Sequence, residues 1–322
     1  MQRMLCCAVC LLFISCLGRD PLQPEPIPVD PDQPYLHLVS DSLFTSLPCH
    51  VNFMFQVADL NKHGFTNLVL EDLRFNEDNR PLSPSESEVK LKKRGSPDYQ
   101  LRTVLMLDNS ASVGPNLQEI KAAAKALLQL IDKNQRIAIY SFSEHVILLQ
   151  DFTDDVNLLE KAVDSLKHGP KSTDLYGAVI TGTGRWKEEY NEKQVIDGFL
   201  LLLTDGADKQ GRHTLDHSKS SLFHKKILAV GVGGELDSKI LSDIANCGFA
   251  QIGNYTDLRA KFLEFQKFMI DWANSFYWLK YTSPKRGDFN HTLTMFLWPT
   301  GSATAQGSLS IPYNSANFIS GL

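Results

Sequence analysis

The feature that most constrains the fold is a regular alternation of apolar strands and helical stretches between residues 101 and 273. Two predicted strands, Thr103–Leu107 and Phe199–Leu203, are almost continuously apolar, which suits a parallel sheet covered on both faces. This alternation predicts a doubly wound α/β domain with a mostly parallel open sheet. The strands are predicted at Leu101–Leu107, Arg136–Phe142, Val146–Phe152, Gly198–Thr204, Ile227–Val232 and Ala250–Ile252, and the helices at Leu117–Ile131, Val156–Leu166, Leu175–Tyr190, Thr214–Phe223, Leu236–Ala245 and Asp257–Ala273.

The link between the second and third predicted strands is only Ser143–His145. A connection this short joins antiparallel strands, because a parallel crossover needs a dozen or more residues. We therefore expect a hairpin here, with one of the two strands at an edge of the sheet.

The segments on either side of the α/β region read as β structure. Val51–Val57 alternates in polarity, Leu68–Phe75 and Val89–Leu91 are weaker strand candidates, and further strands are expected within residues 276–281, 292–297 and 308–311. Each group is too short to bury a core separately. We therefore predict one small β-sandwich-like module built from residues 35–99 and 274–322, with the α/β domain of residues 100–273 inserted between them.

Three features of these segments carry further expectations. The basic run Lys90–Arg94 is interpreted as a solvated loop, and the aromatic group Tyr277, Trp278 and Tyr281 as packing residues. Cys49 and Cys247 either form one disulfide or remain two buried thiols.

The N-terminus has the layout of an export signal. Residues 1–17 hold one early cation and a short apolar run, which is too short to span a bilayer. The run ends at Cys16 in a lipobox-like phrase, so both lipid attachment and plain signal cleavage are open. Residues 18–34 contain six prolines and read as a semi-extended tether. We expect an exported protein: a lipoprotein of the cell envelope, outer membrane or cell surface, or a secreted or periplasmic one.

Oxygen-bearing side chains follow two predicted strands of the α/β region, and one more lies in a loop between them. Asp108, Ser110 and Ser112 follow the first strand, Thr173 lies in a later loop, and Asp205 follows the fourth strand. Open α/β sheets place ligand sites at the carboxyl ends of their strands. Two carboxylates and three hydroxyls, with no Cys or His, suit Mg²⁺, Mn²⁺ or Ca²⁺ rather than zinc or copper.

This combination, Asp-x-Ser-x-Ser, then Thr-Asp, then Thr-Asp-Gly, resembles the metal-ion-dependent adhesion site (MIDAS) of von Willebrand factor type A domains. The resemblance covers roughly residues 100–272, and the segment from Phe55 to Pro81 resembles the β module that precedes this domain in many exported bacterial proteins. It implies that Asp108, Ser110, Ser112, Thr173 and Asp205 hold a divalent cation, Mg²⁺ first, with one coordination position open to a ligand carboxylate. The surrounding surface, expected to set partner choice, comprises Asn109, Ala111, Lys171, Asp174 and Asp208.

The predicted function is non-enzymatic binding of a protein ligand that presents an Asp or Glu carboxylate to the cation. The alternative is a structural or assembly component of the cell envelope in which the metal only stabilises the loops. A phosphatase forming an aspartyl-phosphate would need an acid two residues after Asp108, where Ser110 stands. The net charge of −5 gives no basis for a nucleic-acid partner, and membrane contact is expected only through an N-terminal lipid anchor.

Overall fold

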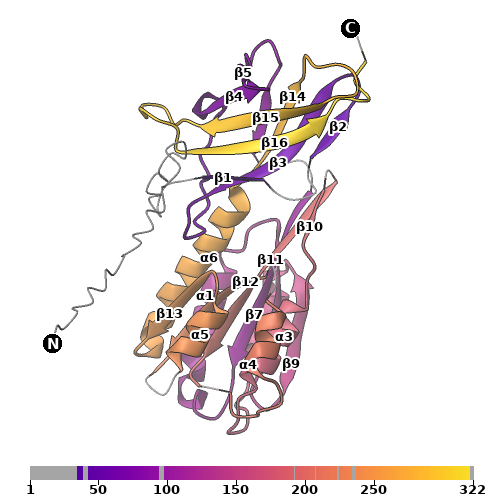
Figure 1. Ribbon diagram of the computed structural model, residues 1–322. Helices are drawn as coiled ribbons and strands as arrows, with labels where there is room; N and C mark the ends of the chain where they lie inside the picture. The colour runs from indigo at the N-terminus through magenta and orange to yellow at the C-terminus, as the bar shows by residue number, and fades with distance from the viewer. Residues whose placement is uncertain are drawn as a thin grey trace, which may run out of the picture. The chain divides into compact units, whose positions relative to one another are not determined.

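The computed structural model describes residues 35–38, 43–93, 98–191, 193–206, 208–222, 225–233 and 237–319. The predicted signal with Cys16, the proline-rich tether and Arg94 lie outside the described residues, so the predictions made for them stay predictions. The described chain forms an α/β domain and a β module, both drawn in Figure 1.

The sheet of the α/β domain runs in the order β13-β12-β11-β7-β8-β9, with all neighbours parallel except the last pair. The short strand β10 (Glu189–Tyr190) pairs antiparallel with the start of β11. The mostly parallel sheet and the antiparallel hairpin with β9 at the edge were both predicted correctly. The main strands are β7 (Asp98–Asp108), β8 (Gln135–Phe142), β9 (Val146–Thr153), β11 (Gln194–Thr204), β12 (Lys226–Val232) and β13 (Gly248–Ile252).

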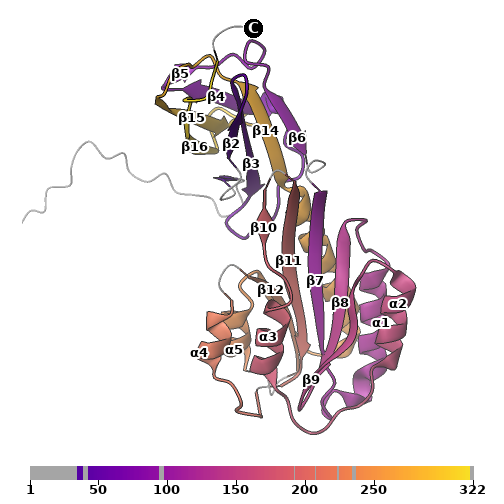
Figure 2. The same ribbon diagram turned by 90° about the vertical axis from the view of Figure 1, so that its right-hand side faces the viewer.

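Helices cover both faces of this sheet, as Figure 2 shows. Successive strand residues point to opposite faces, so Leu105 and Leu107 of β7 pack on one side, whereas Met106 packs on the other. One face is covered by α1 (Leu117–Leu128), α2 (Val156–Ser165) and α6 (Leu258–Asn274), and the other by α3 (Leu175–Thr183), α4 (Leu215–Ser220) and α5 (Ser238–Ile244). No helix within the described residues is long and apolar enough to cross a membrane.

The predicted helix at residues 175–190 is too long, because α3 ends at Thr183. Trp186 continues the apolar spacing of the helix, but it is buried against the sheet at Gly198. Residues 189 and 190 instead form β10, so strand pairing overrides the helical pattern there.

The β module consists of two antiparallel sheets whose strands come from both flanking segments. Strand β14 lies between β3 and β6, and β15 lies between β4 and β16. The predicted pairing of the flanking segments is therefore confirmed. One sheet contains β1 (Tyr35–Leu38), β2 (Phe44–Ser46), β3 (His50–Ala58), β6 (Lys90–Lys93) and β14 (Phe276–Thr282), and the other contains β4 (Leu73–Glu77), β5 (Arg80–Pro81), β15 (Asn290–Leu297) and β16 (Gly307–Asn314).

The structure corrects one prediction for this module and decides between the two alternatives for the cysteines. Lys90–Lys93 form the edge strand β6 rather than a loop, because their backbone pairs with β14. The packing role predicted for the aromatic group is confirmed. Tyr277 and Tyr281 are buried in the module core, and Trp278, on the opposite face of β14, is half-buried and packs against the hydrophobic core of the α/β domain. Cys49 and Cys247 are both free, buried thiols, so the disulfide alternative is wrong.

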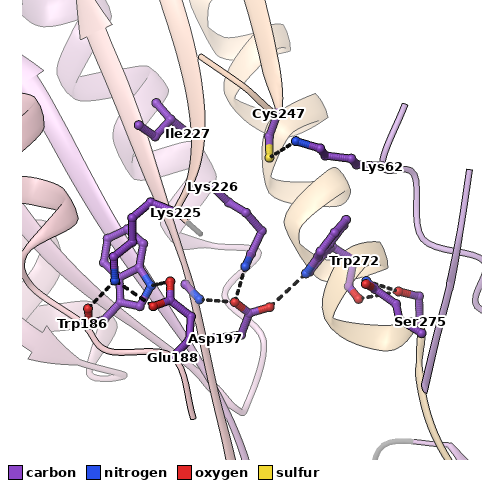
Figure 3. A network of polar contacts seen from close by, with 12 residues as sticks. Lys62, Trp186, Glu188, Asp197, Lys225, Lys226, Ile227, Cys247, Trp272 and Ser275 are labelled. Atoms are coloured by element: carbon purple, nitrogen blue, oxygen red, sulfur yellow. Dashed lines mark hydrogen bonds and ion pairs between the residues drawn. The ribbon is translucent and has the colours of Figure 1, made fainter. Parts of the chain in front are cut away.

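A buried ion pair joins β12 to β11, and a hydrogen bond to the same carboxylate ties α6 to the sheet, as Figure 3 shows. Lys226 Nζ lies 2.5 Å from Asp197 Oδ1, and Trp272 Nε1 donates to Asp197 Oδ2 over 2.9 Å. Asp197 is fully buried, and its Oδ1 also accepts a 2.8 Å hydrogen bond from Gly198 N, so both oxygens depend on donors of the protein.

Candidate metal centre

Asp108 is the last residue of β7, and it is completely buried. Both carboxylate oxygens accept hydrogen bonds: Thr204 Oγ1 donates to Oδ2 over 2.7 Å, and Ser110 N donates to Oδ1 over 2.8 Å. Thr204 ends the neighbouring strand β11, and parallel neighbours bring their carboxyl ends to the same edge of the sheet. The Asp108 carboxylate is therefore held in one orientation.

Three further oxygens lie in a row beside it. Ser110 Oγ is 3.2 Å from Ser112 Oγ, and Ser112 Oγ donates to Asp205 Oδ1 over 3.0 Å. Ser110 and Ser112 belong to the loop after β7, whereas Asp205 follows β11. The two loops predicted to meet are therefore joined directly by side chains.

Thr173 completes this group, which we call the oxygen cluster (Asp108, Ser110, Ser112, Thr173 and Asp205). Its carbonyl accepts a 2.9 Å hydrogen bond from Lys209 N, which holds its loop against the segment after β11. A Cβ added at Gly206 would lie 3.8 Å from Thr173 Oγ1, so the hydroxyl lies next to the Asp205–Gly206 turn. Thr173 is only 2% exposed, and its hydroxyl makes no hydrogen bond within the described residues.

The chemistry and spacing of the oxygen cluster fit a hard divalent cation. Adjacent ligands of an octahedral Mg²⁺ ion lie about 3 Å apart, which matches the spacing of the Ser110, Ser112 and Asp205 oxygens. Burial raises the pKa of Asp108 to about 6, against the hydrogen bonds from Thr204 and Ser110, and burial also raises the pKa of Asp205. A nearby cation favours the ionised form of such carboxylates.

The described residues contain no group of three or more His, Cys, Asp or Glu side chains placed to hold a metal. Carboxylate and hydroxyl oxygens make up the oxygen cluster instead, which is a donor set for Mg²⁺, Mn²⁺ or Ca²⁺ rather than for a structural zinc ion.

A hollow of about 540 Å³ lies beside the oxygen cluster. Ser112 and Asp205 form one part of its wall, and the Tyr255 hydroxyl lies 3.5 Å from Asp205 Oδ2. Burial keeps the pKa of Tyr255 well above its ordinary range, so its hydroxyl remains a donor. Lys209 and Asn254 add polar groups to the same wall. The hollow is large enough for a ligand side chain next to the cluster.

Two of the predicted surface residues lie on the loops around the oxygen cluster. Lys171 is exposed, and Ala111 is half-buried with its N–H donating to Pro170 O over 3.0 Å. Asn109 is also half-buried, but its Nδ2 donates to Lys167 O over 2.8 Å. Its amide thus braces the neighbouring loop.

The two acidic residues predicted for this surface have structural contacts. Asp174 is 5% exposed and caps α3 by accepting a 3.0 Å hydrogen bond from Gly177 N. Asp208 is half-buried and accepts a 2.9 Å hydrogen bond from Gly211 N. Asp174 in particular presents little surface to a ligand, because its carboxylate is used inside the loop.

Sequence reasoning missed two residues at this centre. Thr204 was part of the Thr-Asp-Gly motif, but only the sheet register shows that its hydroxyl faces Asp108. Tyr255 lies 50 residues after Asp205 in a short 3-10 helix, η3 (Tyr255–Asp257). No local sequence pattern connects it with the cluster.

A comparison with protein families finds a match for the region that holds the oxygen cluster. The family model described as von Willebrand factor type A domain matches residues 103–207. Residues 103–207 therefore match a von Willebrand factor type A domain. All five residues of the oxygen cluster fall inside the match, whereas Lys209 and Tyr255 lie beyond it. A search of curated proteins finds no match.

Solved structures resemble the chain at low sequence identity. A von Willebrand factor type A protein from Catenulispora acidiphila is 14% identical, with 88% of this chain and 76% of that chain covered at a TM-score of 0.49. The ArnB paralog VWA2 from Sulfolobus acidocaldarius is 16% identical, with 88% and 75% covered at 0.46. Proximal thread matrix protein 1 from the mussel byssus, solved with a zinc-occupied MIDAS motif, is 18% identical, with 59% and 49% covered at 0.42.

Proposed function

We propose that the von Willebrand factor type A domain holds a divalent cation, Mg²⁺ first, in the oxygen cluster and binds a protein ligand through it. The observation that carries the proposal is the row of Ser110, Ser112 and Asp205 oxygens, spaced 3.0–3.2 Å apart and opening into the hollow. When bound, the cation supplies an electrophilic position for an Asp or Glu carboxylate of the ligand.

The roles of the protein residues follow from their contacts. Ser110, Ser112 and Asp205 would hold the cation from two loops, with the hydroxyl of Thr173 from a third. Asp108 lies behind them, and its burial and its two hydrogen bonds orient its negative charge toward the same place. Only two carboxylates serve the cation, so the ion keeps enough positive charge to attract a third from the ligand.

The hollow gives the ligand more than one contact. A ligand carboxylate at the oxygen cluster would place the neighbouring part of the ligand near Lys209 and Tyr255. These side chains offer an ammonium group and a hydroxyl donor, so we propose that they contribute to the choice of ligand.

We further propose that the chain is exported and is not an enzyme. Export rests on the signal-like residues 1–17, with Cys16 as the site of lipid attachment in a lipoprotein. The non-enzymatic role rests on the side chains at the centre: both carboxylates are assigned to the cation, and hydrolysis would need a further general base beside it.

Isothermal titration of the purified chain with Mg²⁺ and Mn²⁺ tests the cation site. We expect saturable binding that Asp205→Ala and Ser112→Ala abolish, whereas Asp243→Asn on exposed α5 leaves it unchanged. Binding that is unaffected by Asp205→Ala would overturn the assignment of the oxygen cluster.

Partner capture in the presence and absence of chelator tests the role of the cation. A captured protein that is released by EDTA, and lost in Asp205→Ala, supports cation-mediated binding. Capture that survives EDTA and Asp205→Ala would favour the alternative, in which the metal only stabilises the loops and the partner binds elsewhere.

A further inference from the structure

The outer face of the five-stranded sheet carries a hollow of about 350 Å³, which we call the basic hollow (Phe44, Asn52, Lys90, Lys92, Trp278 and Lys280). The strand registers place these side chains on one face. Lys280 on β14 lies opposite Lys90 on β6, and Trp278 lies opposite Lys92. On the other side of β14, Lys280 lies opposite Asn52.

The three lysines of the basic hollow form no ion pair among the described residues. Lys90, Lys92 and Lys280 are exposed, and within the described residues no carboxylate lies within 4.0 Å of their ammonium groups. Like charges directly opposite each other destabilise a sheet. Burial lowers the pKa of His50, and the charges of Lys280 and Lys90 lower it further, whereas the charge of Glu88 raises it.

The floor of the basic hollow is aromatic and recessed. The rings of Trp278 and Phe44 meet edge-to-face with centroids 5.9 Å apart, and both side chains are half-buried below the exposed lysines. Asn52, which lies between Phe44 and Lys280 in the register, is 9% exposed. A recessed floor fits a ligand that enters the hollow, whereas membrane insertion needs aromatic side chains that protrude.

The edge of the sheet limits the kind of ligand further. Strand β6 is the edge strand next to β14, and Figure 2 shows it at that edge of the sheet. Within the described residues, the backbone of Lys90–Lys93 pairs only with β14. Lys90 and Lys92 are two residues apart, so their Cα atoms are separated by about 6.7 Å along the strand. An extended peptide with acidic residues at alternating positions has the same repeat.

From these observations we infer that the basic hollow binds an extended acidic segment of a protein partner, with Asp or Glu at every second position, alongside β6. Main-chain hydrogen bonds to the free edge would give affinity, and the lysines would select the acidic side chains. The same lysines repel the edge strand of another copy of this chain. This site needs no cation.

Fluorescence anisotropy of the full chain with a labelled peptide of alternating Glu and Val tests the inference. We expect saturable binding that weakens as salt is raised. Lys92→Glu and Lys280→Glu are each expected to weaken binding by about tenfold or more. Lys280→Glu replaces the like-charge contact with Lys90 by an attractive one, so it is expected to fold at least as well as the wild type. The melting temperatures of both variants check that they fold. Lys133→Glu, on an exposed loop of the α/β domain, is the charge-matched control.

Three outcomes would overturn the inference. One is no binding of the alternating peptide, and another is equal binding of a peptide with the same residues in separate Glu and Val blocks. The third is binding of phosphatidylserine vesicles or of a sulfated polysaccharide that the alternating peptide does not compete away. Binding that persists in EDTA and in Asp205→Ala separates this site from the proposed cation site.

Discussion

The Thr204 hydroxyl and the Asp108 carboxylate lie 2.7 Å apart, both fully buried, where β11 and β7 end side by side. This hydrogen bond joins two strands whose loops carry most of the oxygen cluster. It fixes the orientation of a carboxylate that water does not reach, so Thr204 acts as a positioning residue for the centre.

Removing the Thr204 hydroxyl is expected to weaken the cation site. Thr204→Val leaves Asp108 Oδ2 without its donor, so we expect Mg²⁺ affinity to fall by about 10–100-fold and the free energy of unfolding by about 1–3 kcal/mol. Titration calorimetry and urea unfolding measure the two effects. Thr204→Ser keeps the hydroxyl and is expected to retain most of both; equal losses in the two variants would contradict this role.

Removing only one partner of the ion pair between Asp197 and Lys226 is expected to destabilise the fold. Lys226→Met leaves the fully buried Asp197 carboxylate uncompensated, so the free energy of unfolding is expected to fall by about 3–5 kcal/mol. The double variant Asp197→Leu/Lys226→Met removes both charges and is expected to be more stable than Lys226→Met alone. Denaturant unfolding measures both.

The exposed pair of Lys219 and Asp243 serves as the matched control. Lys219→Met is expected to change the free energy of unfolding by less than about 1 kcal/mol, because solvent screens this pair. A loss of similar size in Lys219→Met and Lys226→Met would show that burial of Asp197 is not the cause.

Asp78 is expected to make the β module sensitive to acid. The Lys285 ammonium at 2.7 Å, the Thr292 N–H and His291 hold the pKa of Asp78 well below its usual range. A carboxylate with a lowered folded-state pKa stabilises the fold above its unfolded pKa, near 4, and this contribution is lost as pH falls through the folded value. The difference in unfolding free energy between wild type and Asp78→Asn is therefore expected to shrink below about pH 4.

The Asp78→Asn variant isolates this charge effect. Asp78 and Asn79 both have positive φ, at 49° and 64°, and asparagine tolerates that conformation. The turn between β4 and β5 is thus expected to survive. A difference that stays constant from pH 7 to pH 3 would contradict the assigned ion pair.

Gly198 in β11 is expected to tolerate no side chain. A Cβ there would lie 2.5 Å from Trp186 Nε1 and 2.8 Å from the carbonyl oxygen of Arg102. We expect Gly198→Ala to lower the free energy of unfolding by about 1–3 kcal/mol through overpacking. In a Trp186→Phe background the smaller ring is expected to reduce this penalty; an unchanged penalty would place the clash on the backbone side.

The sequence by itself determined the α/β alternation, the edge hairpin and the five residues of the oxygen cluster. These features are readable because they are local: continuous apolar strands, a link of three residues, and short motifs at strand ends. The pairing of the two flanking β segments also followed from the sequence, since neither could bury a core alone.

Only the tertiary structure decided features that depend on contacts between distant residues. The end of α3 was set by pairing of β10 with β11, and the strand character of Lys90–Lys93 by the backbone of β14. No local sequence pattern predicts either feature, because both depend on backbone hydrogen bonds to another strand. Contacts between distant residues also bring Thr204 to Asp108 and Tyr255 to Asp205, and strand pairing places Lys90 opposite Lys280 at the basic hollow.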